Sequence, residues 1–533
     1  MYLVTSEQMQ LFDRRTISTL CVPGIVLMEH AGKAVAEHAA SRGPQHVVVV
    51  CGKGNNGGDG WVAARWLRHV GVSVEVVSVV PVSELTGDAC LAAKMAERAG
   101  VPWRLLGEES KLAVDERPGT KLGTDTQPGT NSGGEWLPRA DVYIDALLGT
   151  GSNRPVAPDS RYGRVIQALN QSGAWVIAVD VPSGIDASTG CVGGVAVTAH
   201  ETVSFAAEKL GTAISPGCQY AGRVHVVDIG IRLDADAEAG PLAEWVTEQN
   251  VARWLPDRPP SSHKGTYGRV AIALGAMQGA AVLAGLGAAR GGCGLVALVG
   301  PHPPTLSVPP EFVVRSGVGD LLAAVSDCKA LVLGPGLGQA VDVWRPLLSE
   351  FPGPVVLDAD GLRLIQQAQA GLPSRTERSA EEEIAEIALA NDAGPAPRAV
   401  LTPHPKECAR LLGWSTADVQ ARRLEAATTL ARRTGAVVVL KGYHSLIADP
   451  SGRLAVNPTG DASLATAGTG DVLAGLIGGL LAQGLAPFAA AAAGTWIHGR
   501  AGEMAGEAMG RASVMASDVI DNISRAIHLH FDK

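Results

Sequence analysis

Residues 55–60 of this 533-residue chain read NNGGDG, which places two amides and a carboxylate among three glycines. An apolar run, HVVVVCG (residues 46–52), precedes them, and a helical pattern, WVAARWLRHVG (residues 61–71), follows. A strand, a glycine-rich loop and a helix can bind a ligand in this order, because glycine lets the backbone come close and the amides at a helix N-terminus attract anions. The amide and carboxylate side chains could then bind polar groups. One such loop is more often a plain turn.

Two further apolar runs end in polar loops, DALLGTG (residues 145–151) and VDVPSGIDASTG (residues 179–190). Ligands of open α/β sheets bind at the carboxyl ends of the strands, so three such loops together predict a site. Asn56, Asp145 and Ser183 offer only oxygen ligands of low total charge, which fits a monovalent or hard cation better than zinc. Backbone carbonyls could complete the shell.

Two aspartates are candidates for proton transfer. Asp180 lies beside the first group and could bind a hydroxyl or move a proton, or it could simply cap its loop through a hydrogen bond. Asp471 follows a glycine turn at the start of an apolar helix (residues 465–484). Backbone amides of residues 468–470 would face an anion, and Asp471 could take the proton of a hydroxyl that attacks a phosphoryl group. Capping of the helix is its alternative role.

Other strand ends in the second half carry polar residues or glycines. Lys441 in LKGYHSLIAD could face a nucleotide phosphate, and His404 lies between two prolines in LTPHPKE, as a ligand contact or a brace for the loop. Gly336 and Gly338 in LGPGLG would permit close approach of a ligand. The chain has no GxxxxGK[ST] motif, which disfavours a P-loop nucleotidase.

The elements that must position these residues form two series of apolar strands separated by helical segments. The first series lies at residues 46–52, 73–80, 141–149, 174–182, 202–207 and 223–230, and the second at residues 263–276, 330–338, 354–362, 399–405 and 436–449. Continuous apolar strands between helices predict parallel sheets covered on both faces, and the length of the chain favours two domains. Residues 107–138 and 371–398 are predicted surface insertions, the latter bearing a helix.

Composition restricts the function classes. The net charge is −9, and no long Lys/Arg cluster suggests a nucleic-acid partner. The first residues lack the pattern of a signal peptide and no long apolar run predicts a membrane span, so we expect a soluble, cytoplasmic protein. Eight scattered cysteines without a CxxC pair indicate reduced, mostly buried thiols. The alanine-rich helices near residues 485–510 are compatible with a homo-oligomer or with burial inside one chain.

These motifs together resemble two known families. GNNGGDG, DALLGTG and VDVPSGID are similar to the NAD(P)H-hydrate epimerases, which have a Rossmann-like fold. HKGTYGRV, GPGLG, DADGL, LTPHPKE and AGTGDVLAG are similar to the ADP/ATP-dependent NAD(P)H-hydrate dehydratases, which have a ribokinase-like fold. The order of the motifs resembles the bifunctional repair enzymes of bacteria over nearly the whole chain. The resemblance implies an α/β chain with a Rossmann-like doubly wound epimerase domain (residues 1–235) and a ribokinase-like dehydratase domain (residues 245–533).

The resemblance implies that the first domain interconverts the R and S hydrates of NADH and NADPH (NADHX and NADPHX). Asp180 would contact the substrate, and potassium would be held by Asn56, Asp145 and Ser183. The remaining residues that match the hydrate site are Asn55, Asn56, Gly57, Gly58, Asp59, Gly149, Thr150, Gly151, Ser152, Asn153, Arg154 and Pro155.

For the second domain, the resemblance implies dehydration of the S hydrate, coupled to conversion of ADP to AMP and phosphate, with magnesium on the nucleotide. Bacterial members use ADP, whereas eukaryotic members use ATP. Residues that match the substrate contacts are Ala280, Gly338, His404 and Asp471, and residues that match the nucleotide site are Lys441, Gly442, Tyr443, His444, Ser445 and Gly470. Ser445 replaces the threonine that is commoner at that position and keeps a hydroxyl there.

Two other functions remain open at this stage. The chain could be a small-molecule kinase of ribokinase-like fold with a non-catalytic N-terminal binding domain, because the GTGD turn also serves such kinases. The N-terminal half could alternatively be a partner-binding module, since a fold does not fix a function.

Overall fold

The computed structural model describes residues 1–107, 137–152, 154–234, 236, 238–317, 319–365 and 398–528. The chain divides into two compact units, the N-terminal unit (Tyr2–Gly240) and the C-terminal unit (Pro241–Lys533, with Met1). Both predicted insertions fall almost wholly outside the described residues.

The N-terminal unit is built on a seven-stranded sheet in which all strands are parallel. In sheet order its strands are β4 (Trp103–Leu105), β3 (Ser73–Ser78), β2 (His46–Cys51), β5 (Val142–Ala146), β6 (Trp175–Val179), β7 (Glu201–Phe205) and β9 (Arg223–Val227). The strand order reverses between β2 and β5, which is the topology of a doubly wound sheet. The predicted Rossmann-like α/β fold is therefore confirmed.

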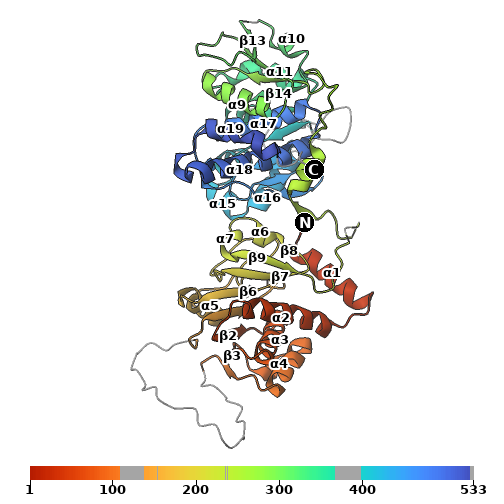
Figure 1. Cartoon of the computed structure of the whole chain (residues 1–533), viewed down its shortest axis with the longest axis vertical. Helices are drawn as coiled ribbons and strands as arrows, with labels where there is room; N and C mark the ends of the chain where they lie inside the picture. Colours follow the sequence, from red (N-terminus) through yellow and green to blue (C-terminus); the bar gives the residue numbers. More distant parts are fainter. Residues whose placement is uncertain are drawn as a thin grey trace, which may run out of the picture. The chain divides into compact units, whose positions relative to one another are not determined.

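Helices cover this sheet because its central strands are largely apolar, as residues 47–51 of β2 show by being fully buried. The helices are α1 (Ser6–Ser18), α2 (Gly24–Ala40), α3 (Asn55–His69), α4 (Gly87–Arg98), α5 (Arg161–Gln171), α6 (Leu210–Ala213) and α7 (Cys218–Ala221). Figure 1 shows α2, α3 and α4 grouped together, with α5 apart from them. A short parallel pair, β1 (Tyr2–Val4) and β8 (Glu208–Lys209), completes the unit.

Glycines in the first turns of α3 serve close packing against the sheet. The helix begins at Asn55, so the NNGGDG segment is helical and is not the loop that the sequence predicts. A Cβ on Gly57 would lie 2.1 Å from the carbonyl oxygen of Gly52, and one on Gly60 would lie 2.5 Å from the Cβ of Ala146. Only glycine permits this approach of α3 to β2 and β5.

The C-terminal unit has a second, mostly parallel sheet. In sheet order its strands are β13 (Val313–Ser316), β12 (Leu295–Gly300), β11 (Arg269–Ala273), β14 (Ala330–Leu333), β15 (Val355–Leu357), β16 (Ala399–Leu401), β17 (Val437–Leu440), β18 (Leu446–Ala448), β19 (Leu454–Val456) and β10 (Ala243–Trp245). Only β18 runs antiparallel to its neighbours β17 and β19. The strand order reverses between β11 and β14. The α/β fold predicted for this half is confirmed.

The helices of the C-terminal unit are α8 (Glu248–Trp254), α9 (Gln278–Arg290), α10 (Leu321–Val325), α11 (Arg345–Glu350), α14 (Pro405–Leu412), α15 (Thr416–Ala421), α16 (Arg423–Thr434), α17 (Thr469–Ala482), α18 (Pro487–Met509) and α19 (Ala516–His528). Figure 1 shows α9, α17, α18 and α19 as one group. The alanine-rich α18 is buried against α17 and α19, so packing within this unit accounts for its apolar surface.

Within the described ranges, every helix is too short or too polar to cross a bilayer. All eight cysteines are free, but only Cys51, Cys328 and Cys408 are buried, so the expectation of mostly buried thiols is wrong.

Candidate functional sites

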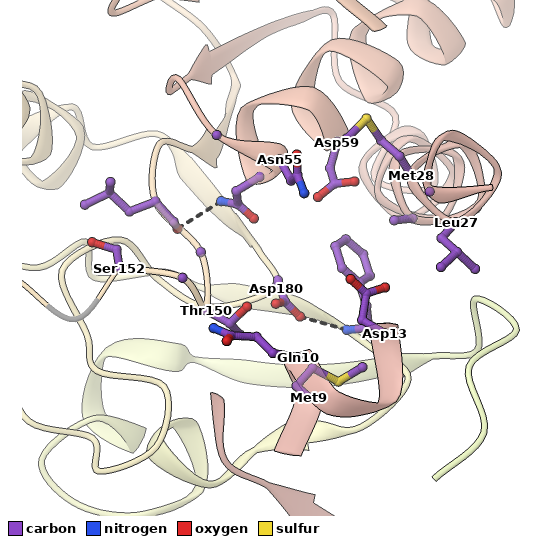
Figure 2. A pocket seen from close by; sticks show the side chains of 18 of the residues that line it. Met9, Gln10, Asp13, Leu27, Met28, Asn55, Asp59, Thr150, Ser152 and Asp180 are labelled. Carbon is purple, nitrogen blue, oxygen red and sulfur yellow. Dashed lines mark hydrogen bonds between the residues drawn. The ribbon is translucent and has the colours of Figure 1, made fainter. Parts of the chain in front are cut away.

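A cavity of about 530 Å³ opens at the carboxyl edge of the N-terminal sheet, beside β2 and β5, between which the strand order reverses (Figure 2). This is the position at which doubly wound sheets bind their ligands. Predicted site residues that line the cavity are Asn55, Asn56, Asp59, Gly149, Thr150, Gly151, Ser152 and Asp180.

The other residues predicted for this site lie elsewhere or outside the described ranges. Gly57 and Gly58 are buried in α3, where Gly58 contacts Met28, and do not line the cavity. Arg154 and Pro155 are exposed and also lie off the lining. Asn153 falls outside the residues that the structure describes.

The predicted cation ligands come together behind the cavity wall. The Ser183 hydroxyl donates a hydrogen bond to Asp145 Oδ1 (2.6 Å), and the Ser183 amide donates to Asp145 Oδ2 (2.8 Å). Asn56 Nδ2 donates to the carbonyl oxygen of Leu148 (2.9 Å), whose amide in turn donates to Ser183 Oγ (2.9 Å). One backbone segment therefore joins all three predicted ligands.

Asp145 is fully buried, and its hydrogen-bond partners are the Ser183 hydroxyl and two backbone amides, all neutral. Burial raises the pKa of Asp145 to about 6, and the hydrogen bonds from Ser183 and Leu147 oppose that rise. A buried carboxylate among neutral oxygen-rich neighbours gains stability from a cation. The donor set of Asn56, Asp145 and Ser183 fits a hard monovalent ion.

Asp180 is held by a buried lysine that the sequence analysis did not single out. Lys209 is fully buried, and its Nζ donates hydrogen bonds to Asp180 Oδ1 and to the carbonyl oxygen of Phe205 (2.8 Å). The Phe205 amide also donates to Asp180 Oδ1 (3.0 Å). Asp180 has φ of +65°, an uncommon conformation for a residue with a side chain. Such strain persists where the surrounding contacts impose it, often at active sites.

Two more carboxyl groups face this ion pair across the cavity. Figure 2 shows Asp13, Asp59 and Asp180 extending into the same space, from α1, α3 and the end of β6. Burial raises the pKa of Asp59 well above its ordinary value, and the Asp180 and Asp13 carboxylates raise it further. Burial and then Asp180 also raise the pKa of Asp13. The cavity thus combines a fixed Asp180–Lys209 pair with a carboxyl group on Asp59 that tends to keep its proton.

The second site lies at the carboxyl edge of the C-terminal sheet. Asp471 stands in the first turn of α17, and Lys441 follows β17. Lys441 Nζ donates a hydrogen bond to Asp358 Oδ1 (2.8 Å), which also accepts one from the Thr402 hydroxyl (2.8 Å). A Cβ on Gly470 would lie 3.5 Å from Lys441 Nζ. The ends of β15, β16 and β17 thus meet the N-terminus of α17.

The charges of this second site interact. Burial and then the neighbouring Asp358 carboxylate raise the pKa of Asp471 to about 6, and Lys441 opposes that rise. Burial disfavours the charged form of Lys441, but the carboxylates of Asp358, Glu407 and Asp471 together raise its pKa. Asp471 is therefore ionised at neutral pH and close enough to its pKa to act as a base.

The remaining predicted residues of the second half are placed as follows. His404 caps α14 and accepts hydrogen bonds from the amides of Lys406 (3.1 Å) and Glu407 (3.3 Å), and its side chain is 47% exposed. Gly338 donates its amide to Asp360 Oδ2 (2.9 Å). Ala280 lies near Gly336, where the strand order reverses.

The segment KGYHS forms a tight turn after β17. The Ser445 hydroxyl donates to the Gly442 carbonyl oxygen (2.9 Å), and the Gly442 amide donates to Ser445 Oγ (3.2 Å). Tyr443 is exposed and stacks on His444, with ring centroids 4.1 Å apart. Ser445 therefore shapes the turn, while Tyr443 offers an aromatic face to solvent.

Sequence reasoning assigned no role to Asp358, Glu407 or His498. The first two stand in the motifs DADGL and LTPHPKE, so their motifs were visible although their roles were not. His498 is buried in α18, burial lowers its pKa to about 4, and its Nε2 has no hydrogen-bond partner among the described residues. Only the folded structure brings it near Thr469 and Lys441.

Comparison with known proteins gives matches to both halves. The model of a family described as "YjeF-related protein N-terminus" matches residues 24–211, and one described as "NAD(P)H-hydrate dehydratase" matches residues 270–525. The bifunctional NAD(P)H-hydrate repair enzyme Nnr of Moorella thermoacetica is 36% identical, over 98% of this chain and 96% of its own length. The enzyme of that name from Salinibacter ruber is 38% identical, over 98% and 95%.

A solved structure, the ADP/ATP-dependent NAD(P)H-hydrate dehydratase of Bacillus subtilis co-crystallised with ATP and Mg²⁺, is 31% identical. It covers 54% of this chain and 99% of its own, with a TM-score of 0.44.

The two sheets, each with charged residues at its carboxyl edge, define a two-unit α/β enzyme with a separate site in each unit. The full-length relatives then fix the family. The chain belongs to the bifunctional NAD(P)H-hydrate repair enzymes.

Proposed function

We propose that the chain restores damaged NADH and NADPH in two steps, with residues 1–235 as the epimerase domain and residues 245–533 as the dehydratase domain. The N-terminal unit interconverts the R and S hydrates. The C-terminal unit dehydrates the S hydrate and converts ADP to AMP and phosphate. The observation that carries the proposal is the Asp471–Asp358–Lys441 cluster at the N-terminus of α17, within a chain that aligns with bifunctional relatives along nearly its whole length.

For dehydration, hydroxide is a poor leaving group, so the ring hydroxyl is first phosphorylated. Asp471 takes the proton of that hydroxyl while its oxygen attacks the β-phosphorus of ADP, and AMP departs. The ring nitrogen then donates its lone pair, the carbon–oxygen bond breaks, phosphate leaves, and loss of a ring proton restores the double bond. The hydroxyl oxygen ends in phosphate, so the step balances.

The first-turn amides of α17 have no partners within the helix and face the anion that develops on the phosphoryl group. The matching nucleotide residues Lys441, Gly442, Tyr443, His444, Ser445 and Gly470 and the substrate residues Ala280, Gly338 and His404 remain assignments of this proposal. Magnesium would reach the site with the nucleotide phosphates, which it usually binds in preference to an all-protein cage, and would neutralise their charge.

For epimerisation, Asp180 holds the proton of the ring hydroxyl while the stereocentre is lost and re-formed. Lys209 keeps Asp180 in place, and Asp59, whose pKa burial raises well above its ordinary value, stands on the opposite wall. Potassium would be held by Asn56, Asp145 and Ser183 and would supply a fixed positive charge behind the hydrate. The lining residues Asn55, Gly149, Thr150, Gly151 and Ser152 surround the bound ring.

The test uses purified full-length protein with mixed hydrate epimers, ADP, magnesium and potassium, and follows the absorbance of the reduced nicotinamide. Omitting ADP or magnesium should stop recovery of NAD(P)H, and omitting potassium should slow consumption of the R hydrate. Asp471→Ala should lower dehydration on the order of 10²- to 10⁴-fold and leave epimerisation intact. Asp320→Ala is a matched control, because Asp320 only caps α10. Full dehydration in Asp471→Ala would remove the proposed base.

A further inference from the structure

Two histidines and a glutamate meet at the end of the N-terminal sheet opposite the cavity. Glu201 begins β7, His225 lies in β9, and His38 stands in the last turn of α2. Within the described residues their ligand atoms all lie within 4.8 Å of one another. The cavity, by contrast, lies at the carboxyl ends of the strands. Asp180, which lines it, directly follows β6.

Strand register explains why these side chains share one face. Glu201 pairs with Arg223 and Val203 pairs with His225 in the parallel β7–β9 ladder. Side chains two residues apart on a strand point to the same face, so Glu201 and His225 are diagonal neighbours on one face. His38 reaches them from α2, and its ring centroid lies 4.3 Å from that of His225.

The distances suit a tetrahedral metal ion. Zinc binds imidazole nitrogen and carboxylate oxygen at about 2.0–2.2 Å, which places two ligand atoms of a tetrahedral site about 3.3 Å apart. His38 Nε2 lies 2.9 Å from Glu201 Oε2, and His225 Nε2 lies 3.8 Å from Glu201 Oε1. The two distances run to different oxygens of Glu201, so one ion would reach both imidazoles only if the carboxylate rotates or binds through both oxygens.

Hydrogen bonding within the cluster satisfies His38 but not His225. His38 Nε2 is hydrogen-bonded to Glu201, but His225 Nε2 is shielded from solvent and has no hydrogen-bond partner in the described part of the chain. It points at a carboxylate oxygen that is beyond hydrogen-bond distance. A buried polar atom without a partner is costly, and a metal ion between it and Glu201 would satisfy it.

The neighbours of Glu201 form the outer shell that metal ligands usually have. Trp175 Nε1 donates a hydrogen bond to Glu201 Oε2 (3.4 Å), and Arg42 Nη1 lies 3.4 Å from both carboxylate oxygens. The Arg42 guanidinium also lies over the Trp175 ring, 3.6 Å from its centroid. Ligating carboxylates are commonly hydrogen-bonded in this way, and a metal on Glu201 would replace part of the long Arg42 contact, which reaches both oxygens.

We propose that His38, Glu201 and His225 form a binding site for Zn²⁺ or a similar first-row transition-metal ion that joins α2 to β7 and β9, with water as the fourth ligand. Two imidazoles select such ions over Mg²⁺ and K⁺, which prefer oxygen. The site lies at the opposite end of the N-terminal sheet from the cavity, and its role is to brace the N-terminal unit. The proposal does not depend on the reaction that the unit catalyses.

The test is equilibrium dialysis of chelator-treated, untagged full-length protein against zinc, followed by elemental analysis. We expect one zinc per wild-type chain and none in His225→Gln or Glu201→Gln. The affinity of each variant for zinc should fall by more than roughly 10- to 100-fold, which is the usual cost of losing a contact that only supports a ligand. His46→Gln is the matched control, because His46 lies in the same unit and its ring contacts the Ser73 hydroxyl, away from the cluster, so it should bind zinc as the wild type does.

Two further measurements keep the result interpretable if a variant folds poorly. Circular dichroism and epimerase activity without zinc should be unchanged in His225→Gln, since the site is at the opposite end of the sheet. Cobalt should give the visible absorption of a tetrahedral site in the wild type and lose it in His225→Gln. Absence of zinc uptake by the wild type, or equal uptake by folded His225→Gln, would overturn the proposal.

Discussion

At the residue scale, the chemistry of the C-terminal unit depends on how Asp358 and Lys441 set the charge of Asp471. Burial and the Asp358 carboxylate raise the pKa of Asp471. Lys441 directs its Nζ to Asp358, so it partly neutralises that carboxylate and opposes the rise. The three side chains come from positions that span 114 residues of chain. Substitution at one of them should therefore change the ionisation of another.

A pH profile measures this coupling. The pKa of Asp471 is raised to about 6, so the base is ionised above that pH and the dehydration rate should fall by about tenfold per pH unit below it. Asp358→Asn removes a neighbouring negative charge and leaves Lys441 without its partner. Both changes favour ionised Asp471, so the midpoint of the acid limb should move to lower pH.

The measurement is the dehydration rate against pH under saturating ADP for both proteins. Asp342→Asn serves as the control, because Asp342 is 70% exposed and pairs only with Arg345 among the recorded ion pairs. An acid limb whose midpoint is the same in Asp358→Asn and in the wild type would show that Asp358 does not control the base.

In the N-terminal unit, Asp180 should be essential and Lys209 should act through it. Asp180→Asn removes the group that handles the proton, and we expect consumption of the R hydrate to slow by on the order of 10²-fold or more. Lys209→Met leaves Asp180 without the cation that holds it, so the rate should fall although the Asp180 carboxylate is still present.

Chromatographic separation of the R and S hydrates over time gives both rates. Asp186→Asn is a nearby control, since Asp186 holds the turn of residues 188–189 and does not line the cavity. An unchanged rate in Asp180→Asn would exclude Asp180 from catalysis, and a Lys209→Met rate equal to that of the wild type would exclude the positioning role.

At the element scale, much of the fold was predictable because the strands are apolar and periodic. The run at residues 46–52 became β2 (His46–Cys51), and the run at residues 223–230 became β9 (Arg223–Val227). Both predicted runs extend past the strand, the first by Gly52 and the second by residues 228–230. Residues 436–449 form the hairpin of β17 and β18 rather than one strand.

The start of α3 and the neighbours of the catalytic acids could not be predicted from local sequence. NNGGDG has the composition of a turn, but packing against β2 and β5 overrides the low helix propensity of glycine. Lys209 and Asp13 lie 29 and 167 residues from Asp180, and no local pattern links them. The cation ligands could be proposed because each lies in or after the carboxyl end of a strand, and parallel strands end at one edge.

Close packing of α9 on α17 depends on small residues, and this predicts a stability effect. A Cβ on Gly475 would lie 1.8 Å from the carbonyl oxygen of Ala284, which cannot move without disturbing α9. Gly475→Ala should therefore destabilise the C-terminal unit by about 1–3 kcal/mol or more, as overpacking does. Gly279 also lies in α9 but a Cβ there meets nothing within 4 Å. Gly279→Ala should be neutral or stabilising by up to about 1 kcal/mol.

Urea denaturation followed by loss of dehydratase activity and by circular dichroism compares the two variants. The sign of the difference is the informative result. If Gly475→Ala unfolds at the same urea concentration as Gly279→Ala, the helices can separate more easily than the structure implies.

At the scale of the whole molecule, each unit has its own sheet, core and site, and the residues of each proposed site come from one unit alone. Each activity should therefore survive loss of the other. Asp471→Ala should epimerise without dehydrating, and Asp180→Asn should dehydrate the S hydrate but leave the R hydrate largely unconverted.

Mixing the two variant proteins tests this independence directly. The S hydrate formed by Asp471→Ala is a free small molecule that Asp180→Asn can dehydrate, so an equimolar mixture with ADP should convert the R hydrate fully to NAD(P)H. The double variant Asp180→Asn, Asp471→Ala is the control and should do neither step. Because the hydrate must diffuse between molecules, the mixture should show a lag that shortens as protein concentration rises. Failure of the mixture, with both single activities intact, would mean that the hydrate does not leave the chain between the two steps.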